Sequence, residues 1–115
     1  MVNQGLHQAI YEKLLSVAKT KDITTYGQIA PLAGLDMESP ADRDEIGRLL
    51  GEISTFEHQH NRPMLSAVVV HKDDKTPGHG FFELARSLGL YVGGDDDAFF
   101  VRELRRAHDY WSANC

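Results

Sequence analysis

The segment from Ile23 to Gly34, ITTYGQIAPLAG, restricts the fold of this chain more than any other stretch. Its first three residues are β-branched and favour a short strand or an extended entry to a helix. Tyr26 to Ala33 then predict a small helix, and glycine is the usual residue just past a helix end. We therefore expect an extended segment that turns into a short helix ending at Gly34.

A longer helix is predicted on each side of this segment. Before it, apolar residues spaced by four, four and three positions share one face of a helix from about Asn3 to Lys19; they are Leu6, Ile10, Leu14 and Val17. After it, Ser39, Pro40 and Asp42 provide a capping hydroxyl, a residue pre-set for the first helical position and an acid in the first turn. An apolar stripe extends this third helix to about Glu57–His60, through Ile46, Leu49, Leu50, Ile53 and Phe56.

The second half of the chain predicts one strand and two further helices. Leu65 to Val70, after Pro63, is the longest strand pattern, and the turn-forming residues from Lys72 to Gly80 predict that it returns as a hairpin. Phe81 to Leu88 has helical spacing and ends at Gly89. Asp95 to Asp97 favour the start of a last helix, with Phe100, Leu104, Ala107 and Trp111 facing inward and Arg102, Arg105 and Arg106 facing outward.

Composition limits the functional classes. A chain of 115 residues that is 42% hydrophobic can bury one core, so we expect one domain over residues 1–115, with a core at 1–80 and a helical extension at 81–115. The formal net charge is -5. Residues 36–60 hold seven acids and two arginines, which account for all of that charge. This balance excludes a protein that coats phosphate backbones unspecifically.

Cysteine usage and hydropathy point to the cytoplasm. The single cysteine, Cys115, excludes an internal disulfide and favours a reducing compartment. Residues 1–10 lack the basic start and apolar run of a signal peptide, and no apolar stretch approaches the roughly 18 residues of a spanning helix. We expect a soluble, cytoplasmic protein without a membrane partner, and no cofactor motif is recognisable.

The predicted order of elements is that of a winged helix-turn-helix: a mostly α fold with a small β-hairpin, extended by two C-terminal helices. Three stretches, TYGQIA at residues 25–30, Ile46-Gly47, and Pro63 before Val68-Val69, resemble the DNA-binding domain of methylated-DNA-protein cysteine methyltransferases and their alkyltransferase-like relatives. The resemblance covers residues 23–80. It implies that Tyr26 matches the tyrosine that rotates a damaged nucleotide out of the duplex.

Two positions depart from the pattern of that family. Asp44 stands where the family inserts an arginine into the base stack, so an attractive charge is replaced by a repulsive one. Met64 stands at the acceptor cysteine, and Leu65-Ser66 replace the His-Arg that follows it. A thioether cannot form the thiolate that dealkylation requires, so alkyl transfer is not expected.

We therefore predict a non-catalytic module that binds nucleic acid or a protein partner through the third helix and the wing. The acidic third helix favours the protein partner. For Tyr26, the alternative is a structural role in which the ring packs and the hydroxyl meets water or backbone. The candidate contact residues are Tyr26, Arg43, Asp44, Arg48, Arg62, Lys72, Lys75 and His79.

Two other functional classes remain open. One is a small metal-dependent hydrolase or nuclease, with His58, His60, His71, His79, Asp73 and Asp74 as candidate ligands. Residues two apart on a helix point in different directions, so His58 and His60 could share a metal only beyond the helix end, and no metal site is predicted. The other class is a helical adaptor that docks through Trp111 and the neighbouring aromatic residues of the C-terminal helix.

Overall fold

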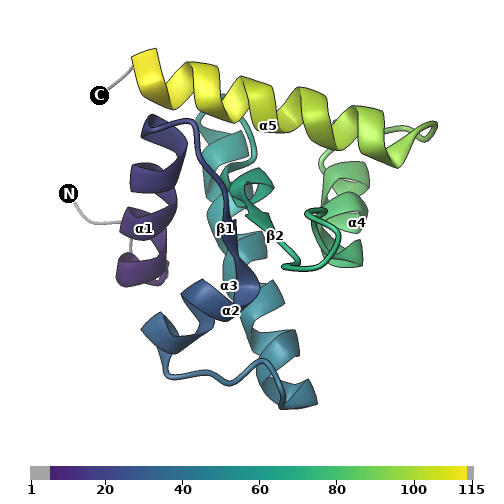
Figure 1. The fold of residues 1–115 in the computed structure, drawn as a ribbon. Helices are drawn as coiled ribbons and strands as arrows, with labels where there is room; N and C mark the ends of the chain where they lie inside the picture. The colour runs from purple at the N-terminus through teal and green to yellow at the C-terminus, as the bar shows by residue number, and fades with distance from the viewer. Residues whose placement is uncertain (1–5, 114–115) are drawn as a thin grey trace.

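A computed structural model describes residues 6–113 of the chain. In these residues the fold is mostly helical, and α5 lies across one end of the other helices (Figure 1). The elements are α1 Gln8–Lys19, β1 Thr24–Thr25, α2 Tyr26–Ile29, a 3₁₀ helix Ala30–Ala33, α3 Pro40–Gln59, a 3₁₀ helix Leu65–Val68, β2 Val69–Val70, α4 His79–Ser87 and α5 Asp96–Ala113.

The predicted helix starts and stops around α2 and α3 are confirmed. Thr25 caps α2, because its hydroxyl accepts a hydrogen bond from the Gln28 amide at 3.2 Å and the Gln28 side chain accepts one from the Thr25 amide. Gly34 ends the 3₁₀ helix that continues α2, with a left-handed φ of 69°. The Ser39 hydroxyl accepts a hydrogen bond from the Asp42 amide at the start of α3.

Helix α1 begins later than predicted. It starts at Gln8, where the His7 ring accepts a hydrogen bond from the Ile10 amide at 3.3 Å, whereas the apolar spacing placed its start near Asn3. Asn3 lies outside the described residues. The predicted apolar face is confirmed for Ile10 and Leu14, which are fully buried.

The predicted strand Leu65–Val70 is wrong over most of its length. Leu65–Val68 forms a 3₁₀ helix, and only Val69–Val70 is extended. Side chains hold two amides of this segment: the Met64 amide donates to Glu103 at 2.9 Å, and the Ser66 amide donates to Ser54 at 3.0 Å. The apolar run predicted burial correctly, because every residue from 64 to 70 is buried.

The predicted β-hairpin is also wrong. Strand β2 pairs in parallel with β1, with Thr24 opposite Val69 and Thr25 opposite Val70. The segment expected to form the wing closes on itself instead, because the His71 amide donates to the Thr76 carbonyl at 2.8 Å, and the chain then enters α4. The part of the winged helix-turn-helix prediction that concerns the wing is therefore wrong.

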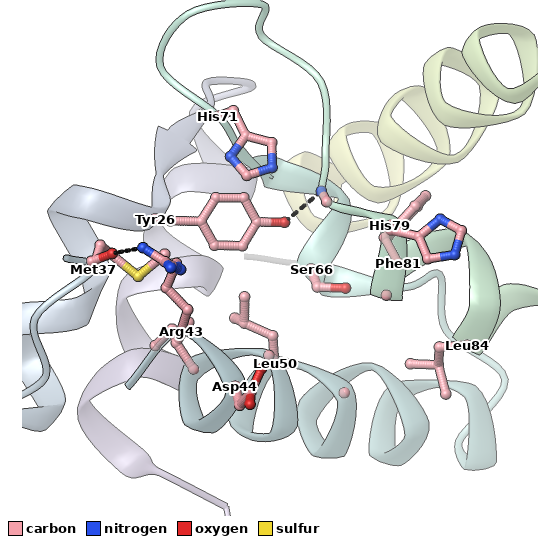
Figure 2. A pocket seen from close by; sticks show the side chains of 15 residues that line it. Tyr26, Met37, Arg43, Asp44, Leu50, Ser66, His71, His79, Phe81 and Leu84 are labelled. Atoms are coloured by element: carbon pink, nitrogen blue, oxygen red, sulfur yellow. Dashed lines mark hydrogen bonds between the residues drawn. The ribbon is translucent and has the colours of Figure 1, made fainter. Parts of the chain in front are cut away.

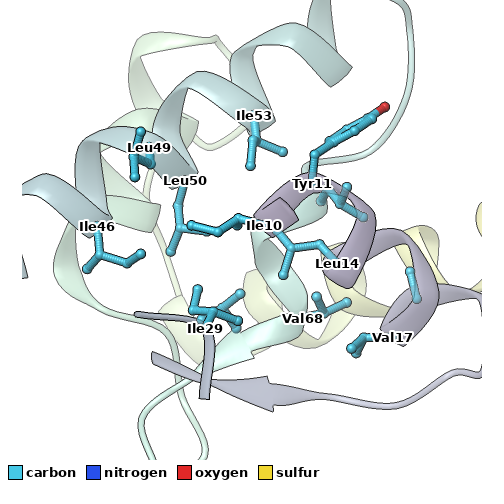
Figure 3. Packing of buried hydrophobic residues seen from close by; sticks show 13 residues of the cluster. Ile10, Tyr11, Leu14, Val17, Ile29, Ile46, Leu49, Leu50, Ile53 and Val68 are labelled. Carbon is cyan, nitrogen blue, oxygen red and sulfur yellow. The ribbon is translucent and has the colours of Figure 1, made fainter. Parts of the chain in front are cut away.

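The core consists of two neighbouring apolar clusters. The first joins α1, α2 and α3 with the 3₁₀ helix Leu65–Val68 and includes Leu14, Leu50 and Ile53 (Figure 3). The second joins the segment 64–70 with α4 and α5. Residues 81–113 thus pack against the preceding elements instead of forming a separate unit. No helix within residues 6–113 combines the length and the apolarity needed to cross a membrane.

A buried carboxylate fixes α3 against α1 and the segment that follows α3. Glu57 is fully buried and accepts hydrogen bonds from Arg62 at 3.0 and 2.9 Å and from the Tyr11 hydroxyl at 2.8 Å. Burial and the bond to Glu57 raise the pKa of Tyr11 to about 12. The guanidinium of Arg62 also lies over the rings of Phe56 and Trp111, at 5.4 and 5.7 Å from their centroids. Arg62 is therefore part of the internal framework.

Candidate binding pocket beside Tyr26

A cavity of about 370 Å³ lies between α3, Tyr26 and the start of α4 (Figure 2). We call it the Tyr26 pocket. Its apolar wall includes Ile46, Leu50, Phe81 and Leu84. Its polar side chains are those of Tyr26, Arg43, Asp44, Ser66, His71 and His79, which come from five different parts of the chain. A mostly apolar cavity with a few convergent polar groups is typical of ligand sites.

Tyr26 forms one side of the pocket and is hydrogen-bonded to the segment between β2 and α4. Its hydroxyl accepts a hydrogen bond from the Gly78 amide at 2.7 Å, and the His71 ring packs on its ring with a centroid separation of 4.7 Å. Burial raises the pKa of Tyr26, so the phenol stays protonated at neutral pH. The backbone contact predicted under the structural alternative is present, and it fixes the segment between β2 and α4 to the pocket wall.

Arg43 and Asp44 bring opposite charges to the first turns of α3. The Nη1 atom of Arg43 donates to the Met37 carbonyl at 2.9 Å, which directs the guanidinium toward the loop before α3. Asp44 is exposed, and within residues 6–113 its carboxylate has no hydrogen bond or ion pair. The pocket therefore has a carboxylate free to accept hydrogen bonds and an arginine already bound at one nitrogen.

Two glycines lie one turn apart on the pocket side of α3. Gly47 and Gly51 both line the cavity, and a Cβ atom at Gly47 would have no neighbouring heavy atom within 4 Å. At Gly51 the nearest atom would be Leu84 Cδ2 at 3.9 Å, which is an ordinary contact. Glycine inside a helix costs about 0.5–1 kcal/mol relative to alanine. Packing does not require glycine at either position, and the absence of longer side chains there leaves the cavity open.

The segment from Met64 to Ser66 presents its serine to the pocket. Met64 is fully buried in the second cluster and does not line the cavity. Ser66 does line it, but its hydroxyl lies 2.6 Å from the Ser54 hydroxyl, and its amide donates to the same atom. Ser66 is thus bound into the wall between α3 and the 3₁₀ helix, and within residues 6–113 its hydroxyl has no hydrogen bond to a histidine.

The predicted cations do not gather around the pocket. Arg48 is paired with Glu45 and Glu52 at 2.6 Å each, an arrangement that lowers the pKa of Glu45. Arg62 is held by the buried Glu57. Lys72 and Lys75 are exposed in the loop after β2 and do not line the cavity. Of the five predicted arginines and lysines, Arg43 alone lines the Tyr26 pocket.

The predicted histidines do not form one cluster. His58 lies on α3, the His60 ring bonds to the Phe56 carbonyl at 2.8 Å, and His71 and His79 line the pocket. His79 pairs with Glu83 at 3.2 Å on the exposed side of α4. Within the described part of the chain, no group of three or more His, Cys, Asp or Glu side chains could hold a metal ion.

Sequence reasoning missed several pocket residues. Gly51, Ser66 and Leu84 line the cavity, yet none was a candidate, because their types carry no chemical signal. The two glycines spaced by four within the α3 pattern were the one available sign of an open helix face. Comparisons with protein-family models, curated proteins and solved structures give no match, so the pocket is judged on its own geometry.

Proposed function

We propose that this protein is a non-catalytic binding module whose site is the Tyr26 pocket and the adjoining face of α3. The observation that carries the proposal is the cavity at Gly47. A mid-helix glycine with no neighbour within 4 Å of its Cβ position weakens α3 without improving its packing. Proteins tolerate such costs at sites where function requires an open surface.

A protein partner is the favoured class. Asp44 offers an unpaired carboxylate at the pocket, whereas both α3 arginines have partners: Arg48 is bound by two carboxylates and Arg43 by the Met37 carbonyl. Binding to a phosphate backbone requires cations that are free to displace counterions. The α3 face offers few of them, and its carboxylates would repel the phosphates.

Nucleic acid remains a second candidate, supported by Tyr26. The stretch around it resembles that of the alkyltransferase-like family, and its ring stands at a cavity large enough for an extruded base. The phosphate contacts would then come from Lys72 and Lys75 in the exposed loop after β2. Such binding would be weak and strongly dependent on salt, because two lysines displace few counterions.

Site-specific photo-crosslinking in cells that express the full chain tests the proposal. A photoreactive amino acid replaces Arg48 on α3 or, as the control, Glu12 on the exposed side of α1. We expect adducts from position 48 that protease removes and nuclease does not. These adducts should disappear when Gly47→Leu fills the pocket. Nuclease-sensitive adducts would favour the second candidate, and equal adducts from both positions would contradict the site.

A further inference from the structure

A second hollow lies beside the Tyr26 pocket along α3. This hollow is lined by Leu6, Arg48, Gly51, Glu52, Thr55, Phe56, Gln59 and Leu84, so Gly51 and Leu84 belong to both. We call the two together the α3 groove. Among its α3 residues, Asp44, Arg48, Gly51, Thr55 and Gln59 recur every three or four positions, which places these five on one helix face about 22 Å long at 1.5 Å per residue.

The borders of the α3 groove are acidic. Asp44 stands at the pocket and Glu52 lines the second hollow, with Glu45 beside them on α3. Glu83 is exposed on α4, next to Leu84 of the groove wall. Arg43 and Arg48 also line the hollows and balance Asp44 and Glu52, so the excess of two negative charges comes from the flanking Glu45 and Glu83. Arg48 bridges Glu45 and Glu52 and can neutralise one of them, which leaves a negative field along the α3 face.

The floor of the groove is apolar at one end. Leu50, Phe81 and Leu84 line the deep Tyr26 pocket, whereas the second hollow is shallower and half of its eight lining residues are polar. A ligand that matches both parts has one large apolar group for the pocket and positive charges for the border. Apolar anchors in pockets supply most of the affinity at such interfaces, and complementary charges supply orientation and rate.

We propose that the α3 groove binds a lysine- or arginine-rich segment of another protein, which inserts one large apolar side chain into the Tyr26 pocket. This inference rests on the proposed function and names the chemistry of its partner. An extended segment of about seven residues covers the groove length. The positive charges of the segment lie against Asp44, Glu52 and Glu83, and the apolar side chain lies against Leu50 and Phe81.

Selection of displayed peptides on the purified full-length protein tests this inference. The probe is a library of random peptides of about twelve residues, longer than the groove requires. We expect selected peptides to share a net positive charge and one aromatic or large aliphatic residue. The binding of a selected peptide is then measured for three variants.

Gly47→Leu should weaken binding at least about 30-fold, because the anchor loses its pocket. Asp44→Arg should weaken it about tenfold at low salt, and Glu12→Arg, the same charge change on α1, should leave it within about twofold.

The outcomes separate the inference from the proposed function. Peptides without excess positive charge that still lose binding to Gly47→Leu would overturn the inference and leave the binding site standing. Peptides that bind Gly47→Leu as well as the native chain would contradict both. Failure to enrich any peptide, together with binding of a duplex oligonucleotide that Gly47→Leu abolishes, would overturn the inference in favour of nucleic acid.

Discussion

Filling the Tyr26 pocket at Gly47 should stabilise the protein. Alanine at this position replaces a helix-interior glycine and meets no atom within 4 Å, so Gly47→Ala should raise the free energy of unfolding by about 0.5–1 kcal/mol. For a domain of this size, 1 kcal/mol corresponds to roughly 4 °C in the melting temperature. Leucine has nearly the same helix propensity, and its side chain can cover the apolar wall formed by Leu50 and Phe81.

The alanine and leucine variants separate helix propensity from pocket filling. Urea unfolding curves of the native chain, Gly47→Ala and Gly47→Leu give the three free energies, and the slopes should be unchanged. We expect the two variants to agree within about 0.5 kcal/mol, with ligand binding kept by alanine and lost by leucine. Destabilisation by both would show that Gly47 is required for packing. Destabilisation by leucine alone would show that the cavity is closed in solution.

Three further predictions concern the buried polar groups. Tyr26→Phe removes the acceptor of the Gly78 amide and should cost about 1–2 kcal/mol in urea unfolding, with faster hydrogen exchange at that amide. The fold raises the pKa of Tyr11 to about 12, so the protonated phenol contributes its full stabilisation below about pH 10 and loses it as the pH rises toward 12. Tyr11→Phe should therefore remove this part of the alkaline pH dependence of the free energy of unfolding. Glu103→Ala leaves the buried Met64 amide without its acceptor and should lower the free energy of unfolding by about 2–3 kcal/mol. Glu103→Gln keeps an acceptor and should lower it by less than half as much. A similar loss in both variants would contradict the role of Glu103 as the acceptor of the Met64 amide.

Local signals were enough to predict most helix boundaries. Ser39 and Pro40 mark the start of α3, and Gly34 marks the stop after α2, because capping bonds and backbone dihedrals depend on a few adjacent residues. The strand and the hairpin could not be predicted in this way. The apolar run from Leu65 to Val70 is compatible with any buried conformation, and its backbone is fixed in part by Glu103, which lies far along the chain.

The residues that line the Tyr26 pocket were predicted only in part, because residue type is visible in the sequence and tertiary contacts are not. Tyr26, Arg43, Asp44 and His79 were candidates by residue type, and the fold brings all four to one cavity. Arg62 was also a candidate, but its charge is used by the buried Glu57, a contact that the sequence does not reveal. The spacing of Gly47 and Gly51 is visible in the sequence, but the cavity at this face of α3 is a property of packing and depends on α4 lying beside α3.

Amide spectra of the nitrogen-15-labelled protein give the most direct test of the central claim, that the α3 groove binds a basic protein segment. Glycine amides occupy their own region of such spectra, and Gly47, Gly51, Gly78 and Gly80 all line the Tyr26 pocket. The protein is titrated at physiological salt with a selected basic peptide and, separately, with duplex DNA. We predict that the peptide shifts these four signals and leaves that of Gly27, which lies outside the pocket, in place, and that DNA shifts none of the five. Shifts at the pocket glycines with DNA, and elsewhere with the peptide, would contradict the account.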